Sequence, residues 1–308
     1  MEHREGNHEG PFERLTEDDL GNYWNLFAPL FLHLEVFRYR DATLPSEWIT
    51  DFAEQHGGLF GGLPRFYSGL DAVYSLGMIN EYLERSKLDL TERPKALTAL
   101  QSYMIHASSG NGHTVPEVSG FHPERLEWEN YERVVREAPW NFSWYSTRRY
   151  LQGHSSFTEP LGAGAGEGLW LIRKSLVDET KDARGIPDGG LFLLSTIPGH
   201  WLEEGKEIRL EDFPTAYGTI SLKVKSHIES RGEIHVGFAF DRHLGKQAYG
   251  EDAPEAWYGL DRIYLRLVPP PAILEEGRKP TADAPLEFYD PYTLVLPPGQ
   301  EGDLVIRY

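Results

Sequence analysis

The segment from Ser108 to Glu124, SSGNGHTVPEVSGFHPE, combines residue types that can move protons. It holds an imidazole at His113 and a carboxylate at Glu117, and Pro116 restricts the backbone directly before that carboxylate. A carboxylate placed within hydrogen-bond reach of a substrate can donate or accept a proton during a reaction. Long loops in compact domains are usually functional or disordered. The segment therefore indicates a loop that acts on a ligand, and a solvated charge is the alternative for Glu117.

A second carboxylate, Asp71, falls within a segment that we expect to be a helix. The run from Phe66 to Arg85, FYSGLDAVYSLGMINEYLER, has apolar residues at helical spacing, and Asp71 shares a face with Tyr67 and Tyr74. A buried carboxylate without a partner is costly. Asp71 is therefore either paired, with Arg65 as a candidate, or part of a functional site.

Aromatic and polar side chains alternate in two further segments. Such sets either pack in a core or present flat apolar faces beside hydrogen-bonding groups. The stretch PWNFSWYSTRRY supplies one set and the first predicted helix supplies the other: Trp140, Asn141, Trp144 and Arg148, and Tyr23 and Trp24. These residues are candidates for contacts with a substrate.

The elements that must position these residues change in kind along the chain. Helices are predicted before about residue 185, over 19–37, 48–56, 66–85, 94–107 and 162–177. Seven short alternating segments separated by turns follow: GLFLLST, KEIRLEDF, GTISLKVKSHI, EIHVGFAF, DRIYLRLV, YTLVLPP and DLVIRY. This pattern predicts an antiparallel β-sandwich.

The charged segment Asp178–Gly190, rich in turn residues, is the predicted boundary. We therefore expect an α+β chain with two domains, in which 1–16 is a flexible N-terminal segment, 17–184 is helical and 185–308 is the sandwich.

Composition excludes several classes of function. The formal net charge is −18, with 48 acidic and 30 basic residues, so nucleic acid and anionic membrane surfaces are not expected as partners. The absence of cysteine excludes disulfides and thiolate metal sites. The histidines are scattered, and His227 and His235 are expected to be surface or cross-strand residues, so no metal site is expected. No cofactor motif is found.

Targeting signals are not evident either. The N-terminal segment has no apolar signal-peptide core, and no apolar run is long enough to cross a membrane. The expected location is the cytoplasm if Met1 is the true start.

Several segments together resemble the C-terminal part of six-hairpin glycosidase-like proteins. They are GLDAVYSLGMINEYLE, HTVPEVSG, GAGEGLWLIRKSLVDE with the strands after it, and the final LVIRY. In such proteins an (α/α)6 toroid is followed by a β-sandwich, and the resemblance covers residues 17–308. It implies that Asp71 and Tyr74 lie on the active face of a toroid helix, and that Glu117 lies in an acidic loop at the toroid mouth.

The resemblance implies a glycoside hydrolase that acts on an oligo- or polysaccharide, with Asp71 and Glu117 as its carboxyl pair. Tyr74, His113, Asn141 and Arg148 would also permit a polysaccharide lyase. A non-catalytic carbohydrate-binding or scaffold fragment is the third alternative. A complete toroid of six hairpins has twelve helices, more than the segments predicted above. We therefore expect the chain to be either the C-terminal piece of a larger protein or a shortened relative. A partial toroid would expose the inner faces of its helices and would need self-association or an upstream helical region to cover them.

Overall fold

The computed structural model describes residues 59–60, 62–66, 69–106, 118–121, 154–157, 162–181, 187–241, 259–283, 285, 287–296 and 301–308. Only the backbone is described for 59–60, 64–66, 69–74, 105–106, 118–121, 154–157 and 162–163. The chain divides into two compact units between Leu171 and Ile172, inside one helix. The domain boundary expected at residues 184 and 185 stays a prediction, and the two units are described separately.

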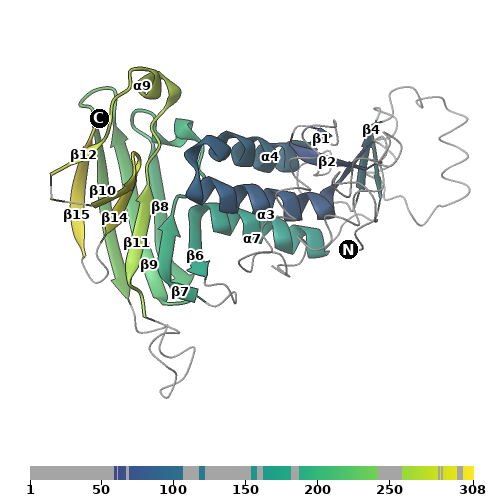
Figure 1. Ribbon diagram of the computed structural model, residues 1–308, viewed down its shortest axis with the longest axis horizontal. Coiled ribbons are helices and arrows are strands. Elements are labelled where there is room, and N and C mark those ends of the chain that lie inside the picture. The colour runs from purple at the N-terminus through teal and green to yellow at the C-terminus, as the bar shows by residue number, and fades with distance from the viewer. Residues whose placement is uncertain are drawn as a thin grey trace, which may run out of the picture. The chain divides into compact units, whose positions relative to one another are not determined.

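The described part of the first unit contains helices and one small sheet (Figure 1). The helical elements are α3 (Ala72–Leu88), η4 (Leu90–Glu92), α4 (Arg93–His106) and the first part of α7 (Gly162–Leu176). The sheet has the order β1-β2-β3-β4-β5, and every neighbouring pair is antiparallel. Its strands are β1 (Leu59–Phe60), β2 (Leu63–Phe66), β3 (Gly69–Asp71), β4 (Val118–Phe121) and β5 (His154–Phe157).

Three predicted helices are confirmed, and the start of one is corrected. The helix expected from Phe66 begins at Ala72, because the residues before it form β2 and β3. Gly69 is a poor helix former, and the aromatic residues before it favour strands. Asp71 therefore lies on a strand and not on a helix. The helices expected over 19–37 and 48–56 lie outside the described residues, and the toroid stays a prediction.

The helices of this unit pack closely through small residues. Ala96 and Ala99 of α4 are fully buried, and α4 packs on α3. The Tyr103 hydroxyl of α4 donates a hydrogen bond to the Gly164 carbonyl of α7, at 3.0 Å. A Cβ added at Gly168 would lie 3.1 Å from the Tyr103 ring and hydroxyl. Gly168 therefore permits this close approach, because it has no Cβ.

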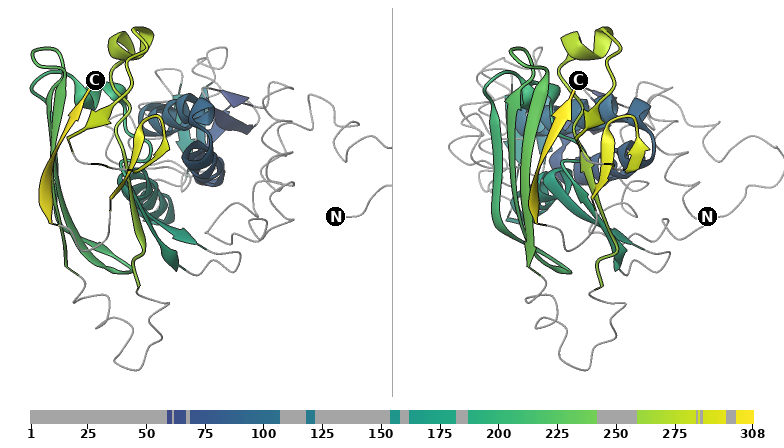
Figure 2. Two further views of the ribbon diagram at one scale, coloured as in Figure 1. Left: turned by 60° about the vertical axis from the view of Figure 1, so that its left-hand side comes forward. Right: turned by 90° about the vertical axis from the view of Figure 1, so that its left-hand side faces the viewer.

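The second unit holds two five-stranded sheets (Figure 2). One has the order β12-β15-β10-β9-β8 and the other has the order β13-β14-β11-β7-β6. The strands are β6 (Val177–Lys181), β7 (Pro187–Leu193), β8 (Glu207–Thr215), β9 (Gly218–His227), β10 (Glu233–Asp241), β11 (Arg262–Arg266), β12 (Thr281–Ala282), β13 (Glu287–Asp290), β14 (Thr293–Leu296) and β15 (Gly302–Arg307). A short helix, α9 (Pro271–Glu275), and the 3-10 turn η7 (Gly199–Leu202) complete the unit.

Each of the seven predicted strand segments contains a strand, so the sandwich prediction is confirmed in outline. All pairs are antiparallel except β7 with β11, which run parallel in the second sheet. The expectation of a wholly antiparallel sandwich is wrong at that pair, because the two strands are far apart in sequence and no hairpin turn sets their direction.

One apolar core draws on both sheets. In β9, Ile220, Leu222 and Val224 are almost fully buried, and the residues between them are more exposed. They belong to the same buried cluster as Leu193 of β7 and Ile263 of β11. Burying one such side chain contributes about 1.5–3 kcal/mol. This core makes the second unit a sandwich with one face of each sheet directed inward.

Candidate functional site

The predicted site residues divide by whether the structure describes them. Asp71 is the last residue of β3 and Tyr74 lies in the first turn of α3, with only their backbones described. The remaining predictions lie outside the described residues: Tyr23, Trp24, His113, Glu117, Trp140, Asn141, Trp144 and Arg148. Their roles stay predictions.

The strand register connects the two segments that carry the predicted carboxylates. Asp71 of β3 is opposite Val118, the first residue of β4, and Leu70 is opposite Ser119. Residues directly opposite each other in an antiparallel pair have Cα atoms about 4.5–5.5 Å apart. Val118 follows Glu117 in the sequence. Sequence reasoning missed this pairing, because strands of three and four residues are too short to give a periodic signal.

A hollow in the second unit, the Trp201 hollow, was not predicted. It has a volume of about 440 Å³ and is lined by His200, Trp201, Lys206, Glu207 and Ile208. Trp201 lies in the turn η7, and its backbone N–H donates a hydrogen bond to the Pro198 carbonyl at 3.0 Å. The side chain is 38% exposed. The sequence signal was a tryptophan two residues after the Pro198–Gly199 pair, outside any long apolar run.

A second hollow, the Gly237 hollow, lies on the sheet that contains β8, β9, β10 and β15. Its volume is about 430 Å³. Gly237 stands opposite Lys223 on one side and Asp303 on the other. A Cβ at Gly237 would lie 3.0 Å from Asp303 Oδ1, so the glycine leaves room for that carboxylate. Arg209 also lines the hollow, and its guanidinium contacts Glu207 at 2.9 Å.

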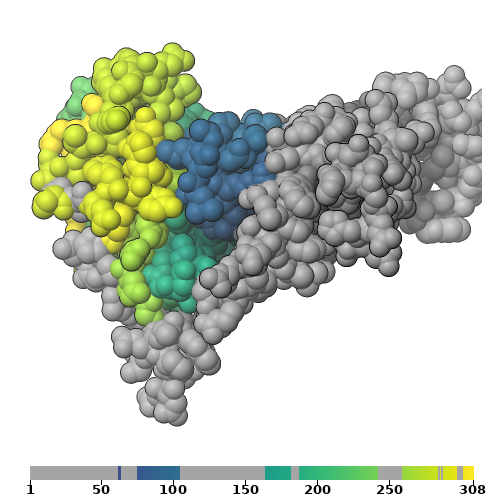
Figure 3. Space-filling model, viewed as in Figure 1, coloured from purple at the N-terminus to yellow at the C-terminus, as the bar shows by residue number. Residues whose placement is uncertain are grey.

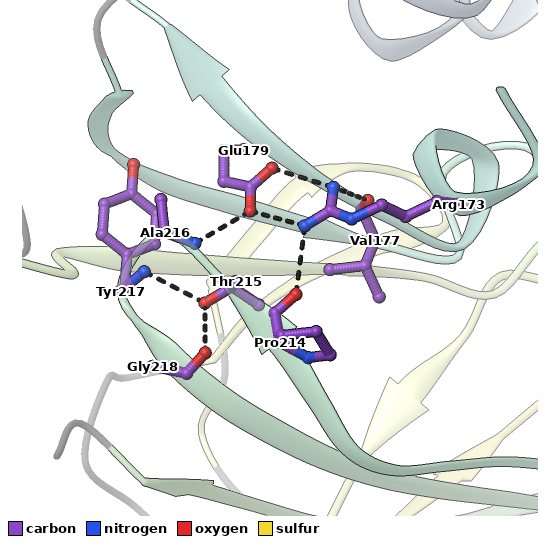
Figure 4. A network of polar contacts seen from close by, with 8 residues as sticks. All are labelled: Arg173, Val177, Glu179, Pro214, Thr215, Ala216, Tyr217 and Gly218. Carbon is purple, nitrogen blue, oxygen red and sulfur yellow. Dashed lines mark hydrogen bonds and ion pairs between the residues drawn. The ribbon is translucent and has the colours of Figure 1, made fainter. Parts of the chain in front are cut away.

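A half-buried ion pair in the same unit has a structural role (Figure 4). Arg173 donates to both carboxylate oxygens of Glu179, at 3.0 and 2.8 Å, and also to the Val177 and Pro214 carbonyls. The Ala216 N–H donates to Glu179 Oε1 at 3.0 Å. Burial alone would raise the pKa of Glu179, but the hydrogen bonds and the charge of Arg173 outweigh it and lower that pKa. Glu179 is therefore held as a charged acceptor that joins β6 to the β8–β9 turn.

Arg266 forms a second network. Its side chain is 1% exposed, and it contacts Asp290 Oδ2 at 2.8 Å, Thr293 Oγ1 at 2.8 Å and the Ser195 carbonyl at 3.4 Å. Its guanidinium carbon also lies 5.3 Å from the centroid of the Phe192 ring. Burial lowers the pKa of Arg266 and the Asp290 carboxylate opposes that shift. Asp290 also accepts hydrogen bonds from the Tyr292 N–H and the Thr293 hydroxyl, so this network stabilises the fold.

Among the described residues, no group of three or more His, Asp or Glu side chains is placed to hold a metal ion. The rings of His227 in β9 and His235 in β10 pack edge to face with centroids 5.3 Å apart, so both are cross-strand residues, one of the two expected alternatives. No helix within the described ranges is long and apolar enough to cross a membrane.

The chain was compared with known proteins. No protein-family model and no curated protein matches it. Among solved structures it is similar to a GH127 beta-L-arabinofuranosidase from Geobacillus Stearothermophilus T6, with 13% identity and a TM-score of 0.34, over 78% of this chain and 31% of that chain. It is also similar to a glycoside hydrolase with 11% identity and a TM-score of 0.35, over 77% of this chain and 32% of that one. The chain spans about a third of the length of these structures.

Proposed function

We propose that this chain belongs to a carbohydrate-active protein that hydrolyses O-glycosyl bonds, with Asp71 and Glu117 as the carboxyl pair. The observation that carries the proposal is the register of β3 and β4. It sets Asp71 opposite Val118, the residue after Glu117. The proposed substrate is an oligo- or polysaccharide.

The chemistry needs two carboxyl groups at a defined separation. One protonates the leaving oxygen, and the other attacks the sugar or activates water. Separations of about 5–5.5 Å suit retention of configuration and about 6.5–9.5 Å suit inversion. Adjacent residues of a strand face opposite sides, so a strand continued back to Glu117 would turn its side chain away from that of Asp71. The proposal therefore requires the chain to leave the strand direction at Pro116 and Glu117.

The remaining predicted residues would complete a sugar site in the first unit. Tyr74 would form its floor, and Trp140 or Trp144 would supply a flat wall. His113, Asn141, Arg148, Tyr23 and Trp24 would donate or accept hydrogen bonds or stack on sugar rings. A toroid, complete in this chain or completed by another copy or by an upstream region, would enclose the site.

Turnover by single-residue variants tests the proposal. Wild type, Glu117→Gln and Asp71→Asn are assayed on aryl pyranosides and furanosides of both anomeric configurations. Each substitution is expected to lower turnover of the accepted glycoside by about 10²–10⁴-fold with little change in melting temperature. Glu229→Gln, at an exposed carboxylate of the second unit, is the matched control and should retain full activity.

Two results would contradict the proposal. Full turnover in either variant would remove that residue from the pair. An unsaturated product from a uronate polysaccharide, detected by its new ultraviolet absorbance, would show lyase chemistry instead.

A further inference from the structure

The Trp201 hollow has the shape and chemistry of a ligand site. The Trp201 side chain is 38% exposed, so part of the indole faces solvent where it lines a hollow of about 440 Å³. Hollows of this volume fall within the range of small-molecule sites, in which apolar rings and a few polar groups converge. The indole supplies the apolar surface here.

The polar groups beside the indole are available. Within the residues that the structure describes, the side chains of His200, Trp201 and Lys206 make no hydrogen bond or ion pair, and all three line the hollow. Glu207 also lines it and is held by Arg209 at 2.9 Å and by Lys223 at 3.8 Å. The hollow therefore combines one flat apolar face, free donors and one oriented carboxylate.

We infer that the Trp201 hollow binds a neutral oligosaccharide, with one sugar ring stacked on the Trp201 indole. The C–H face of a sugar ring matches a flat aromatic surface, and its hydroxyls match the donors and acceptors of Lys206, His200 and Glu207. The charge of the chain favours a neutral ligand over a polyanion. The formal net charge is −18, and Glu203, Glu204 and Glu207 all lie within three residues of Lys206 in sequence.

The Gly237 hollow gives a longer oligosaccharide a second place to bind. The Glu207–Arg209 ion pair contributes one residue to each hollow. Asp303 and Glu301 line the Gly237 hollow, and their carboxylates make no hydrogen bond or ion pair with any other described residue. Both carboxylates can accept hydrogen bonds from sugar hydroxyls. Binding should therefore strengthen with chain length from one sugar to several.

This site goes beyond the proposed hydrolase function. All of its residues belong to the second unit, and none is part of the Asp71–Glu117 pair. Loss of hydrolysis in Glu117→Gln with retained polysaccharide binding would separate the two proposals. Loss of binding in Trp201→Ala with retained turnover on a small aryl glycoside would separate them in the other direction.

Affinity electrophoresis of the full chain tests the site. Gels contain xylan, arabinan, galactan or β-glucan, with polygalacturonate as the anionic comparison. At least one neutral polysaccharide should retard the wild type. Trp201→Ala should weaken that binding at least about tenfold, since buried aromatic contacts dominate recognition, and Asp303→Ala should weaken it about threefold. The control is Tyr289→Ala, because Tyr289 is 45% exposed on β13 and lines neither hollow.

Several outcomes would overturn the inference. The first is that no neutral polysaccharide retards the wild type, or that polygalacturonate alone does. The second is that Trp201→Ala binds as well as wild type. The third is that the control Tyr289→Ala loses as much binding as Trp201→Ala. If Trp201→Ala melts at a lower temperature, the exposed Lys206→Ala and His200→Ala variants decide instead. Each should then weaken binding about threefold at an unchanged melting temperature, and unchanged binding in both would overturn the inference.

Discussion

The helix α3 and the strand β9 bury their residues in opposite ways. In α3 every residue from Ser75 to Leu83 is buried, including Asn80 and Glu81. In β9 buried residues alternate with more exposed ones along most of the strand. A helix enclosed on all sides must satisfy its polar side chains inside the protein, as Glu81 does with Arg85 at 3.0 Å. A strand with one buried face can direct its polar side chains outward.

Apolar burial and polar contacts both stabilise the protein. In α3 they occur on the same enclosed helix, whereas in the sandwich they involve different sets of residues. Its core cluster is apolar, and its charged networks include the buried Arg266–Asp290 pair and the half-buried Arg173–Glu179 pair. On the face seen in Figure 3, residues 259–308 of this unit form most of its coloured surface, with α9 at the top. Substitutions that remove either source should have effects that can be told apart.

The largest loss of stability is expected at the buried Arg266–Asp290 ion pair. Asp290→Ala leaves the Arg266 guanidinium, 1% exposed, without its counterion and should lower the free energy of unfolding by about 3–5 kcal/mol. Urea unfolding measures it. A loss below about 1 kcal/mol would show that Ser195, Thr293 and water can replace the carboxylate.

Matched truncations compare the two cores directly. Leu83 of α3 and Leu222 of β9 are each 1% exposed, and replacing either by Ala should cost about 2–5 kcal/mol. Hydrogen exchange, measured by mass spectrometry, shows which element becomes less stable. Leu83→Ala should reduce protection in α3 and Leu222→Ala in β9. Equal loss in both elements from either variant would show that the two units unfold together.

The Arg173–Glu179 network should give a smaller, pH-dependent effect. Glu179→Gln weakens charge-assisted hydrogen bonds and should cost about 1.5–3 kcal/mol at pH 7. The folded state lowers the pKa of Glu179 from 4.5, so its stabilisation is present above that pH and is lost as pH falls through the folded pKa. Urea unfolding at pH 7 and below 4.5 should show a smaller pH dependence for Glu179→Gln than for wild type. Equal dependence would mean that other carboxylates control acid unfolding.

The smallest effect is expected at the surface. Arg209 contacts Glu207 and Glu211 at 2.9 and 3.3 Å, but its side chain is 53% exposed. Arg209→Ala should change the free energy of unfolding by less than about 0.5 kcal/mol, since exposed ion pairs contribute little. Thermal melting of the variant and of the wild type measures this change in stability. A loss as large as that of Glu179→Gln would show that exposure does not separate these two arginines.

The same contrast explains what the sequence could and could not predict. The strands of the sandwich were found because one buried face leaves an alternating pattern, as Ile220, Leu222 and Val224 show. The strand β6, VDETK, was missed because its polar residues look like a linker. The strand β3 was absorbed into the helix that follows it. The pairing of Asp71 with Val118 joins segments 47 positions apart, and no local pattern records it.

The place of β15 in its sheet has a consequence for synthesis of the protein. β10 pairs with β9 on one side and with β15 on the other, and the long stretch between Asp241 and Gly302 separates the two partners. While the ribosome makes that stretch, one edge of β10 has no native partner and can pair with another nascent chain. Strains that limit chaperone capacity should therefore accumulate aggregates of this chain. Fragments that end between β10 and β15 should aggregate more readily than the full chain.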